Sequence, residues 1–221
     1  LRIVSWMKFV NRDGRAYWVR VDAEPVHDAE GTLSNYIAIE TDVTDRIEQE
    51  RREACLASLQ WVVREVVTSF LGERSTGLCA EPMLRRVGAA LEADRAFLAL
   101  RDATGAFVRT EEWATQGIPP LPPGGPLATV WLEELERGRV VADAGEGGAP
   151  GAVASRIALP VLSAGALDAV VGFEAVRAAR TWRPEEIAVL LALVEGYARA
   201  REREESARRL QLQRRGARRE P

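Results

Sequence analysis

The amino-acid sequence predicts an α+β fold in which most strands are antiparallel. Short runs of alternating apolar and polar residues, joined by Gly-containing turns, predict strands paired as hairpins. Between these runs, apolar residues recur at helical spacing. The 221 residues are 47% hydrophobic and 29% charged, so the chain can bury the core of one or two domains.

The first 45 residues have the pattern of three antiparallel strands. Asp13 and Gly14 supply the positive φ angles of a tight hairpin turn, and a second turn covers residues 28–31. Between the turns, residues 17–23 alternate as in a half-buried strand. Three strands remove little apolar surface from water, so we expect a further element to complete this sheet.

A change to charged residues at Asp45 predicts a helix over residues 46–72. Its apolar residues, spaced by three and four, are Leu56, Leu59, Val63, Val66 and Phe70. This spacing is that of a coiled-coil seam and predicts a parallel homodimer. A helix packed on its own domain gives the same pattern over so short a length, so both interpretations stay open.

The middle of the chain has the pattern of helices alternating with hairpins. We expect a helix from Pro82 to Leu91, a hairpin of 96–100 and 107–113, a short helix over 127–137, a strand at 140–141, a hairpin of 156–162 and 168–176, and a helix from Pro184. Five Pro and three Gly make residues 117–126 a loop.

Charge and apolar runs limit the partners of the chain. Residues 199–221 hold nine Arg and four Glu, a local +5 within a net charge of −3. This tail lacks interleaved aromatic residues, so no nucleic-acid partner is expected. The longest apolar run, Ile187–Val194, has eight residues, so no membrane span is expected. The sequence has only two cysteines, Cys55 and Cys79, and no signal peptide, so the cytoplasm is the expected compartment.

The residue types also restrict catalysis. His27 is the only histidine, and it precedes a turn, so Ser-His-Asp and His-rich metal chemistry are not expected. Neither cysteine lies in a chromophore-attachment or redox pattern, and both are interpreted as inert thiols. We expect no catalytic residues and no metal site, and the cofactor is unknown.

Residues 11–46 resemble the C-terminal half of a PAS domain. The final Asp42, Thr44 and Arg46 are similar to the family's exit motif, at which the last strand is followed by a signalling helix. The resemblance implies that the strands and helices around the usual PAS pocket are not in this sequence. Since the first residue is Leu1, the sequence is read as a piece of a longer protein, whether by truncation, a wrong start or gene degeneration.

Residues 56–200 resemble a GAF domain. The similar stretches are Ile157–Val161, Val170–Val176, Arg180–Trp182 and Pro184–Ile187. The division that follows is a PAS half at 1–45, a signalling helix at 46–72, a GAF domain at 73–200 and a charged helical tail at 201–221.

The two resemblances imply a cytoplasmic sensory or relay module of a bacterial signalling protein. Ligand or conformational signals would pass through helices at 46–71 and 184–213 to an output domain outside these residues, a histidine kinase or a diguanylate cyclase. The alternative is a dimerisation and spacer module whose pocket is filled by its own side chains.

A ligand pocket, if the GAF-like part has one, is expected over its central sheet. The candidate residues are Phe97, Arg109, Trp113, Trp131 and Phe173, with Phe97 and Phe173 on one sheet face. Residues 117–126 and 127–137 would cover it. Arg109 would attract an anion, while Glu111 or Glu112 would oppose one, so a neutral or mildly polar ligand is expected.

Overall fold

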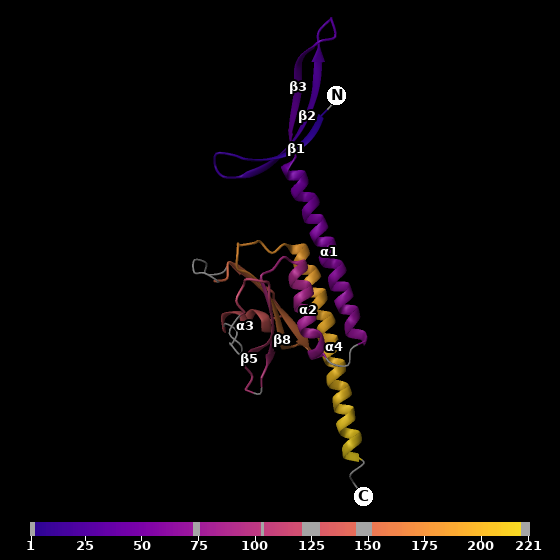
Figure 1. Cartoon of the computed structure of the whole chain (residues 1–221). Helices are drawn as coiled ribbons and strands as arrows, with labels where there is room; N and C mark the ends of the chain where they lie inside the picture. The colour runs from indigo at the N-terminus through magenta and orange to yellow at the C-terminus, as the bar shows by residue number, and fades with distance from the viewer. Residues whose placement is uncertain (1–2, 73–75, 103, 121–128, 145–151, 218–221) are drawn as a thin grey trace. The chain divides into compact units, whose positions relative to one another are not determined.

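The computed structural model describes residues 3–72, 76–102, 104–120, 129–144 and 152–217, and it confirms the α+β class. In chain order the elements are β1 (Ile3–Val10), β2 (Ala16–His27), β3 (Leu33–Asp42), α1 (Thr44–Gly72), α2 (Thr76–Ala90), β4 (Arg95–Arg101), β5 (Phe107–Ala114), α3 (Thr129–Glu136), β6 (Val141–Ala144), β7 (Ser155–Ser163), β8 (Ala166–Ala175) and α4 (Pro184–Ala217) (Figure 1). The chain divides into two compact units, Leu1–Cys55 and Leu56–Pro221, and the boundary lies inside α1.

The first unit contains an antiparallel sheet in the order β1-β2-β3. Turns form at both predicted positions, but the first is a five-residue loop over 11–15 rather than a two-residue turn, and within it Gly14 but not Asp13 adopts positive φ. The side chain of Asn11 accepts hydrogen bonds from the backbone of Asp13 and Arg15, and Asp28 does the same for Glu30 and Thr32. Polar turn residues therefore satisfy the backbone at both ends of β2 and fix the pairing of the three strands.

Large apolar side chains of this sheet remain exposed on both faces. They are Ile3, Val4, Trp6, Met7, Phe9, Val10, Leu33, Tyr36, Ile37 and Ile39. Val19 is the one fully buried hydrophobic residue among the described part of this unit. The unit therefore lacks a core of the size that normally stabilises an independent domain.

The second unit has a five-stranded antiparallel sheet in the order β5-β4-β8-β7-β6. Helices α2 and α4 pack on one face of the sheet, α1 packs against α4, and all three contribute to the larger core, while α3 packs on the other face (Figure 1). The predicted hairpins β4–β5 and β7–β8 are confirmed. In the β7–β8 turn, Ala164 and Gly165 both adopt positive φ, as a tight hairpin requires.

The apolar stripe of α1 lies in the core of the same chain. Leu59, Val63, Val66 and Phe70 are each less than 5% exposed and belong to the core cluster that also contains residues of α2, α4 and the sheet, while Leu56 is half-buried. The structure thus places these four side chains as the intrachain alternative requires. They are not accessible to a second copy unless the core opens.

Helix α2 begins earlier than predicted. Its first residue is Thr76, and Pro82 lies inside the helix, so the expected start at Pro82 is wrong. The reason is a distant partner, because the backbone N–H and the hydroxyl of Thr76 both donate to the Glu204 carboxylate on α4, at 2.8 Å each. This acceptor satisfies a helix-terminal N–H that otherwise has no partner within the helix.

The long helix α4 contacts the domain beyond residue 200. Arg201 pairs with Asp168 on β8, Glu202 accepts from Ser163, and Arg203 donates to the carbonyl of Phe70. The first turn of the predicted tail therefore packs on the second unit. The following residues, 205–214, are exposed.

Helix α1 is long and apolar enough to cross a membrane. A helix buried in the core of a soluble protein can meet the same criteria of length and composition. Its second half carries the core residues described above, including Leu59 and Phe70.

Candidate functional site

A row of charged side chains crosses the face of the five-stranded sheet that α3 covers. Arg95 on β4 is opposite Glu174 on β8, Glu174 is opposite Arg156 on β7, and Arg156 is opposite Asp143 on β6. Directly opposite residues in antiparallel strands share a face. Arg95 also shares its face with Phe97, two residues along β4, which packs in the cluster beneath α3.

Two ion pairs and one ring contact organise this row. Arg95 Nη1 lies 3.3 Å from Glu174 Oε2, and both side chains are buried. Arg156 Nε lies 2.8 Å from Asp143 Oδ1, and the Arg156 guanidinium lies 4.3 Å from the centre of the Trp131 ring. Helix α3 therefore contributes an aromatic wall to a charged sheet surface.

Glu174 is the buried carboxylate of the row. Burial raises the pKa of Glu174 above its usual range, although the neighbouring Arg95, Arg156 and Arg109 oppose that shift and Glu112 adds to it. A buried carboxyl with a raised pKa in a charged cluster is a common property of binding and catalytic sites.

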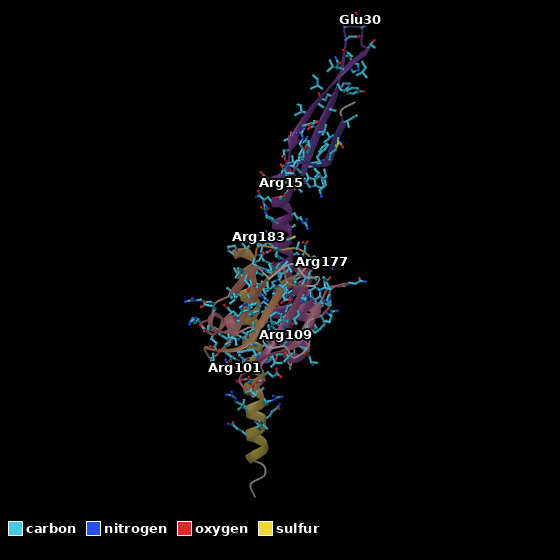
Figure 2. All side chains as sticks on the ribbon, turned by 90° about the vertical axis from the view of Figure 1, so that its left-hand side faces the viewer. Arg15, Glu30, Arg101, Arg109, Arg177 and Arg183 are labelled. Carbon is cyan, nitrogen blue, oxygen red and sulfur yellow. The ribbon has the colours of Figure 1, made fainter. Side chains whose placement is uncertain are left out.

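Arg109 and Glu112 on β5 extend the charged surface. They are opposite Ala99 and Phe97 respectively, and Arg109 Nε lies 3.4 Å from Glu112 Oε1. Residues three apart on a regular strand face opposite ways, but an irregularity between Leu98 and Ala99 shifts the register and places both on one face. Figure 2 labels Arg109. Of the two glutamates expected to oppose an anion, Glu112 is therefore the one beside Arg109.

Two of the predicted pocket residues lie on the sheet face that is opposite to α3. Phe173 is opposite Ala96 and packs in the core beneath α1, α2 and α4, whereas Phe97 is opposite Gly172 and faces α3. Trp113 is also opposite Ala96 and packs with that core. The expectation of one shared face is wrong because neighbouring register positions on a strand alternate between faces.

The face beneath α3 is well filled around Phe97. A Cβ atom added at Gly172 would lie 2.2 Å from two atoms of the Phe97 ring, so that ring lies directly over the glycine. Phe97, Trp131 and Leu135 are all buried there. Of the predicted covering segments, residues 121–128 lie outside the described part of the chain.

Sequence reasoning missed Arg95, Asp143, Arg156 and Glu174. The signal that identifies Arg95 and Glu174 is strand alternation, because each is two residues from a residue on the α3 face, Phe97 and Gly172. Asp143 and Arg156 are identified only through the pairing of β6 with β7, and residues 145–154 separate these two strands in the sequence.

The predicted signal-transfer motif forms the start of α1. Asp42 Oδ1 accepts the backbone N–H of Thr44 at 2.9 Å, and hydrogen bonds from Thr44 lower the pKa of the Asp42 carboxyl. Thr44 Oγ1 in turn accepts the N–H of Trp18 on β2, and Arg46 pairs with Glu50 one turn later. Strand β2 is thus hydrogen-bonded to the first residue of the helix.

Among the residues that the structure describes, no group of three or more His, Cys, Asp or Glu side chains is arranged to hold a metal ion. Cys55 is half-buried on α1, and Cys79 is buried in the core on α2.

Comparison with known sequences gives limited information. No protein-family model matches the chain. A bacterioopsin transcriptional activator of Halobacterium salinarum is 24% identical over 111 residues, a match that covers 47% of this chain and 16% of that protein. The matched segment is therefore a small part of that relative.

Solved structures with the same fold are more informative. The phycocyanobilin-bound GAF domain of a cyanobacterial phytochrome matches with a TM-score of 0.57 and 15% identity, over 67% of this chain and 96% of that one. The GAF domain of a phosphoenolpyruvate-protein phosphotransferase from Coxiella burnetii gives 0.55 and 16%, over 69% and 97%. Free methionine-R-sulfoxide reductase from Neisseria meningitidis, in complex with its substrate, gives 0.56 and 15%, over 69% and 93%.

These matches show that the chain contains the fold of a GAF domain. The reductase shows that the same fold also occurs in an enzyme. The resemblance of residues 11–46 to a PAS domain remains a prediction.

Proposed function

We propose that the chain is a non-catalytic sensory or relay module of a bacterial cytoplasmic signalling protein. In this proposal the face beneath α3 takes a small molecule, and α1 and α4 carry the resulting change to an output domain, a histidine kinase or a diguanylate cyclase. The single observation that carries the proposal is the close packing of α1 on α4.

The two helices approach closely at a glycine. A Cβ atom added at Gly196 would lie 2.8 Å from Val67 Cγ2, so no larger residue fits there without moving α1. One turn further on, Phe70 and Tyr197 meet edge to face with ring centres 5.7 Å apart. Because cores are close-packed, a shift of either helix is transmitted to the other.

Strand β8 connects the α3 face to this helix pair. Glu174 faces the charged row, and its neighbour Phe173 faces the core that contains Tyr197 and Phe70. A ligand that displaces Glu174 would therefore move Phe173 through the same backbone. The expected signal is a small change in the packing of α1 and α4, rather than a change of fold.

The test begins with the small molecule itself. The 221-residue chain is purified from bacterial cytoplasm without denaturation, and its mass is measured intact and after release of bound molecules. We expect the wild type to retain a small molecule and Arg156→Ala to lose it. Arg137→Ala, at an exposed turn residue just after α3, should keep it.

Hydrogen exchange then tests the relay. Addition of the retained molecule to the emptied protein should slow or speed amide exchange in α1 near Phe70 and in α4 near Tyr197. A molecule that binds without changing either helix would contradict the relay.

A second candidate function has a specific observation in its favour. The Phe97 ring over Gly172, together with buried Trp131 and Leu135, fills part of the α3 face with the chain's own side chains. That filling favours a ligand-free dimerisation or spacer module. Wild-type protein with no retained molecule, and with helix exchange unchanged by cytoplasmic extract, would support this alternative.

A further inference from the structure

One turn of α4, residues 201–204, is attached to the sheet of the second unit through two of its residues. Arg201 donates hydrogen bonds to both oxygens of the Asp168 carboxylate on β8. Glu202 accepts hydrogen bonds from the hydroxyl of Ser163, at 3.0 Å, and from the backbone N–H of the next residue, at 3.2 Å. The turn therefore contacts both β8 and the connection between β7 and β8.

The other two residues of this turn contact the two ends of the connection between α1 and α2. Arg203 donates to the backbone carbonyl of Phe70, near the end of α1, at 2.9 Å. Glu204 accepts both hydrogen bonds of Thr76, the first residue of α2. Successive positions on a helix are about 100° apart, so the four residues reach their partners in different directions. A rotation of α4 about its axis would break all four contacts together.

A bulge in β8 directs Asp168 to this turn. The β7–β8 register shifts between Val161 and Leu162, and Asp168 is the residue of β8 that has no opposite residue on β7. Its neighbour Ala169 packs in the core that contains residues of α4, so regular alternation would place Asp168 on the α3 side. The extra residue of the bulge instead brings the Asp168 carboxylate to Arg201.

We propose that residues 201–204 form a latch that opens and closes as one unit and that the pair of Asp168 with Arg201 holds closed. The two side chains are 24% and 19% exposed, so this two-bond ion pair is partly removed from water. Ion pairs of this kind are stronger than fully exposed ones. Residues 205–214, in contrast, are exposed, so opening of the latch would free the end of α4 from the second unit.

The use of this latch in signalling rests on the function proposed above. Strand β8 carries both Glu174, in the charged row beneath α3, and Asp168, in the latch. A shift of β8 that begins at the charged row would therefore reach α4 along a single strand. The latch itself needs no ligand, so it is tested on the chain without one.

Two backbone amides report on the latch separately. The N–H of Thr76 donates to Glu204 and the N–H of Ala164 donates to Glu202, so Asp168 is the acceptor of neither. Amide hydrogen exchange, followed by NMR on the 221-residue chain without added ligand, measures how often each amide opens. Asp168→Asn should speed exchange at both amides by the same factor, about fivefold or more, because one opening event exposes both.

Glu205→Gln is the matched control. Glu205 also lies near Arg201, at 3.9 Å, but it belongs to α4 itself and does not attach the turn to another element. This variant should leave exchange at both amides within about twofold of the wild type. In every variant both amides should exchange faster than those of β4, because the latch opens while the sheet stays folded.

Glu202→Ala provides a reciprocal test at an exposed position, where the substitution does not endanger the fold. It removes the acceptor of the Ala164 N–H and should also speed exchange at Thr76, whose own acceptor is intact. Unchanged exchange at Thr76 in both Asp168→Asn and Glu202→Ala would show that the four contacts open independently and would overturn the latch. Exchange of Thr76 and Ala164 at the rate of β4 would overturn it too. Neither result would affect the test of the sensory function, which depends on a retained molecule.

Discussion

At the scale of the residue, Gly172 leaves almost no space for a side chain, because an added Cβ atom would lie 2.2 Å from the Phe97 ring. Its neighbour across the strand pair, Phe97, is 2% exposed and lies within the cluster beneath α3. The ring has no room to withdraw, because buried Trp131 and Leu135 belong to the same cluster. A side chain at position 172 must therefore deform the sheet or displace α3.

We predict that Gly172→Ala lowers the free energy of unfolding by about 1–3 kcal/mol, the usual cost of overpacking a core. Denaturant titration measures it. Gly72→Ala is the matched control, because a Cβ atom there meets nothing within 4 Å, and it should stay within about 0.5 kcal/mol of the wild type. Equal effects of the two variants would contradict the packing described for Phe97.

Glu174 predicts a pH dependence of stability. Because burial raises its pKa, the folded chain keeps the Glu174 proton at pH values where the unfolded chain has lost it. The free energy of unfolding should therefore fall as pH rises from the ordinary value of 4.5 through the raised pKa. Glu174→Gln should remove this fall, as measured by denaturant titration across that range.

Carboxyl groups whose pKa values are lowered affect the stability of the chain in a more acidic pH range. Hydrogen bonds from Thr104 and Arg139 hold the pKa values of Asp102 and Glu134 below their ordinary 3.8 and 4.5. Their contributions to stability are lost only below those values. Exposed Glu136→Gln controls for the loss of one carboxylate, and a fall that persists in Glu174→Gln would contradict the assignment.

Residue types alone identified part of the candidate site. Phe97, Arg109 and Trp131 lie on the α3 side, as an aromatic and cationic pocket wall requires. Phe173 and Trp113 do not, because hydrophobic type does not say which of two buried faces a residue occupies. The alternation of side chains along a strand assigns a residue to one sheet face only when the strand register is known. On β5 the register cannot be extrapolated from the sequence, because it shifts at the irregularity beside Ala99.

At the scale of the element, the start of α2 depends on α4. Thr76 and its acceptor Glu204 are 128 residues apart in the sequence. Local signals do not locate this start, because the local signal is Pro82, and proline is common at a helix beginning. The β7–β8 hairpin is confirmed with its two-residue Ala-Gly turn, whereas the connection at 11–15 is longer than the two-residue Asp-Gly turn that the sequence predicts.

We predict that Glu204→Ala costs about 1 kcal/mol, the usual effect of losing a helix cap, and speeds amide exchange in the first turn of α2. Glu195→Ala, which removes an exposed glutamate 3.9 Å from Arg199, should change stability by less than about 0.5 kcal/mol. Unchanged exchange at Thr76 in Glu204→Ala would show that the cap is dispensable.

At the scale of the whole molecule, the two units differ in how much apolar surface they bury. The second has a continuous core from α1 to β7, and the first has Val19 alone as a buried hydrophobic residue within its described part. The heptad-like stripe of α1 does not reveal this difference, because apolar residues have the same spacing in a helix buried in a coiled coil and in a helix buried in a domain core.

We predict that β1, β2 and β3 exchange their amide protons much faster than the β7–β8 hairpin, since the first unit opens at little cost. Equal protection of both units in dilute solution would show that the first unit has a stabilising contact not described above.

The contacts of Arg201, Glu202, Arg203 and Glu204 with the second unit have a consequence for protein engineering and for gene recombination. A chimaera that cuts α4 after residue 200 would remove the acceptor at the start of α2 and damage the module it meant to transplant. A splice point beyond residue 205 keeps the module intact. Because each inserted residue turns a helix by about 100°, the length of the graft then sets the angular phase at which any following domain is presented.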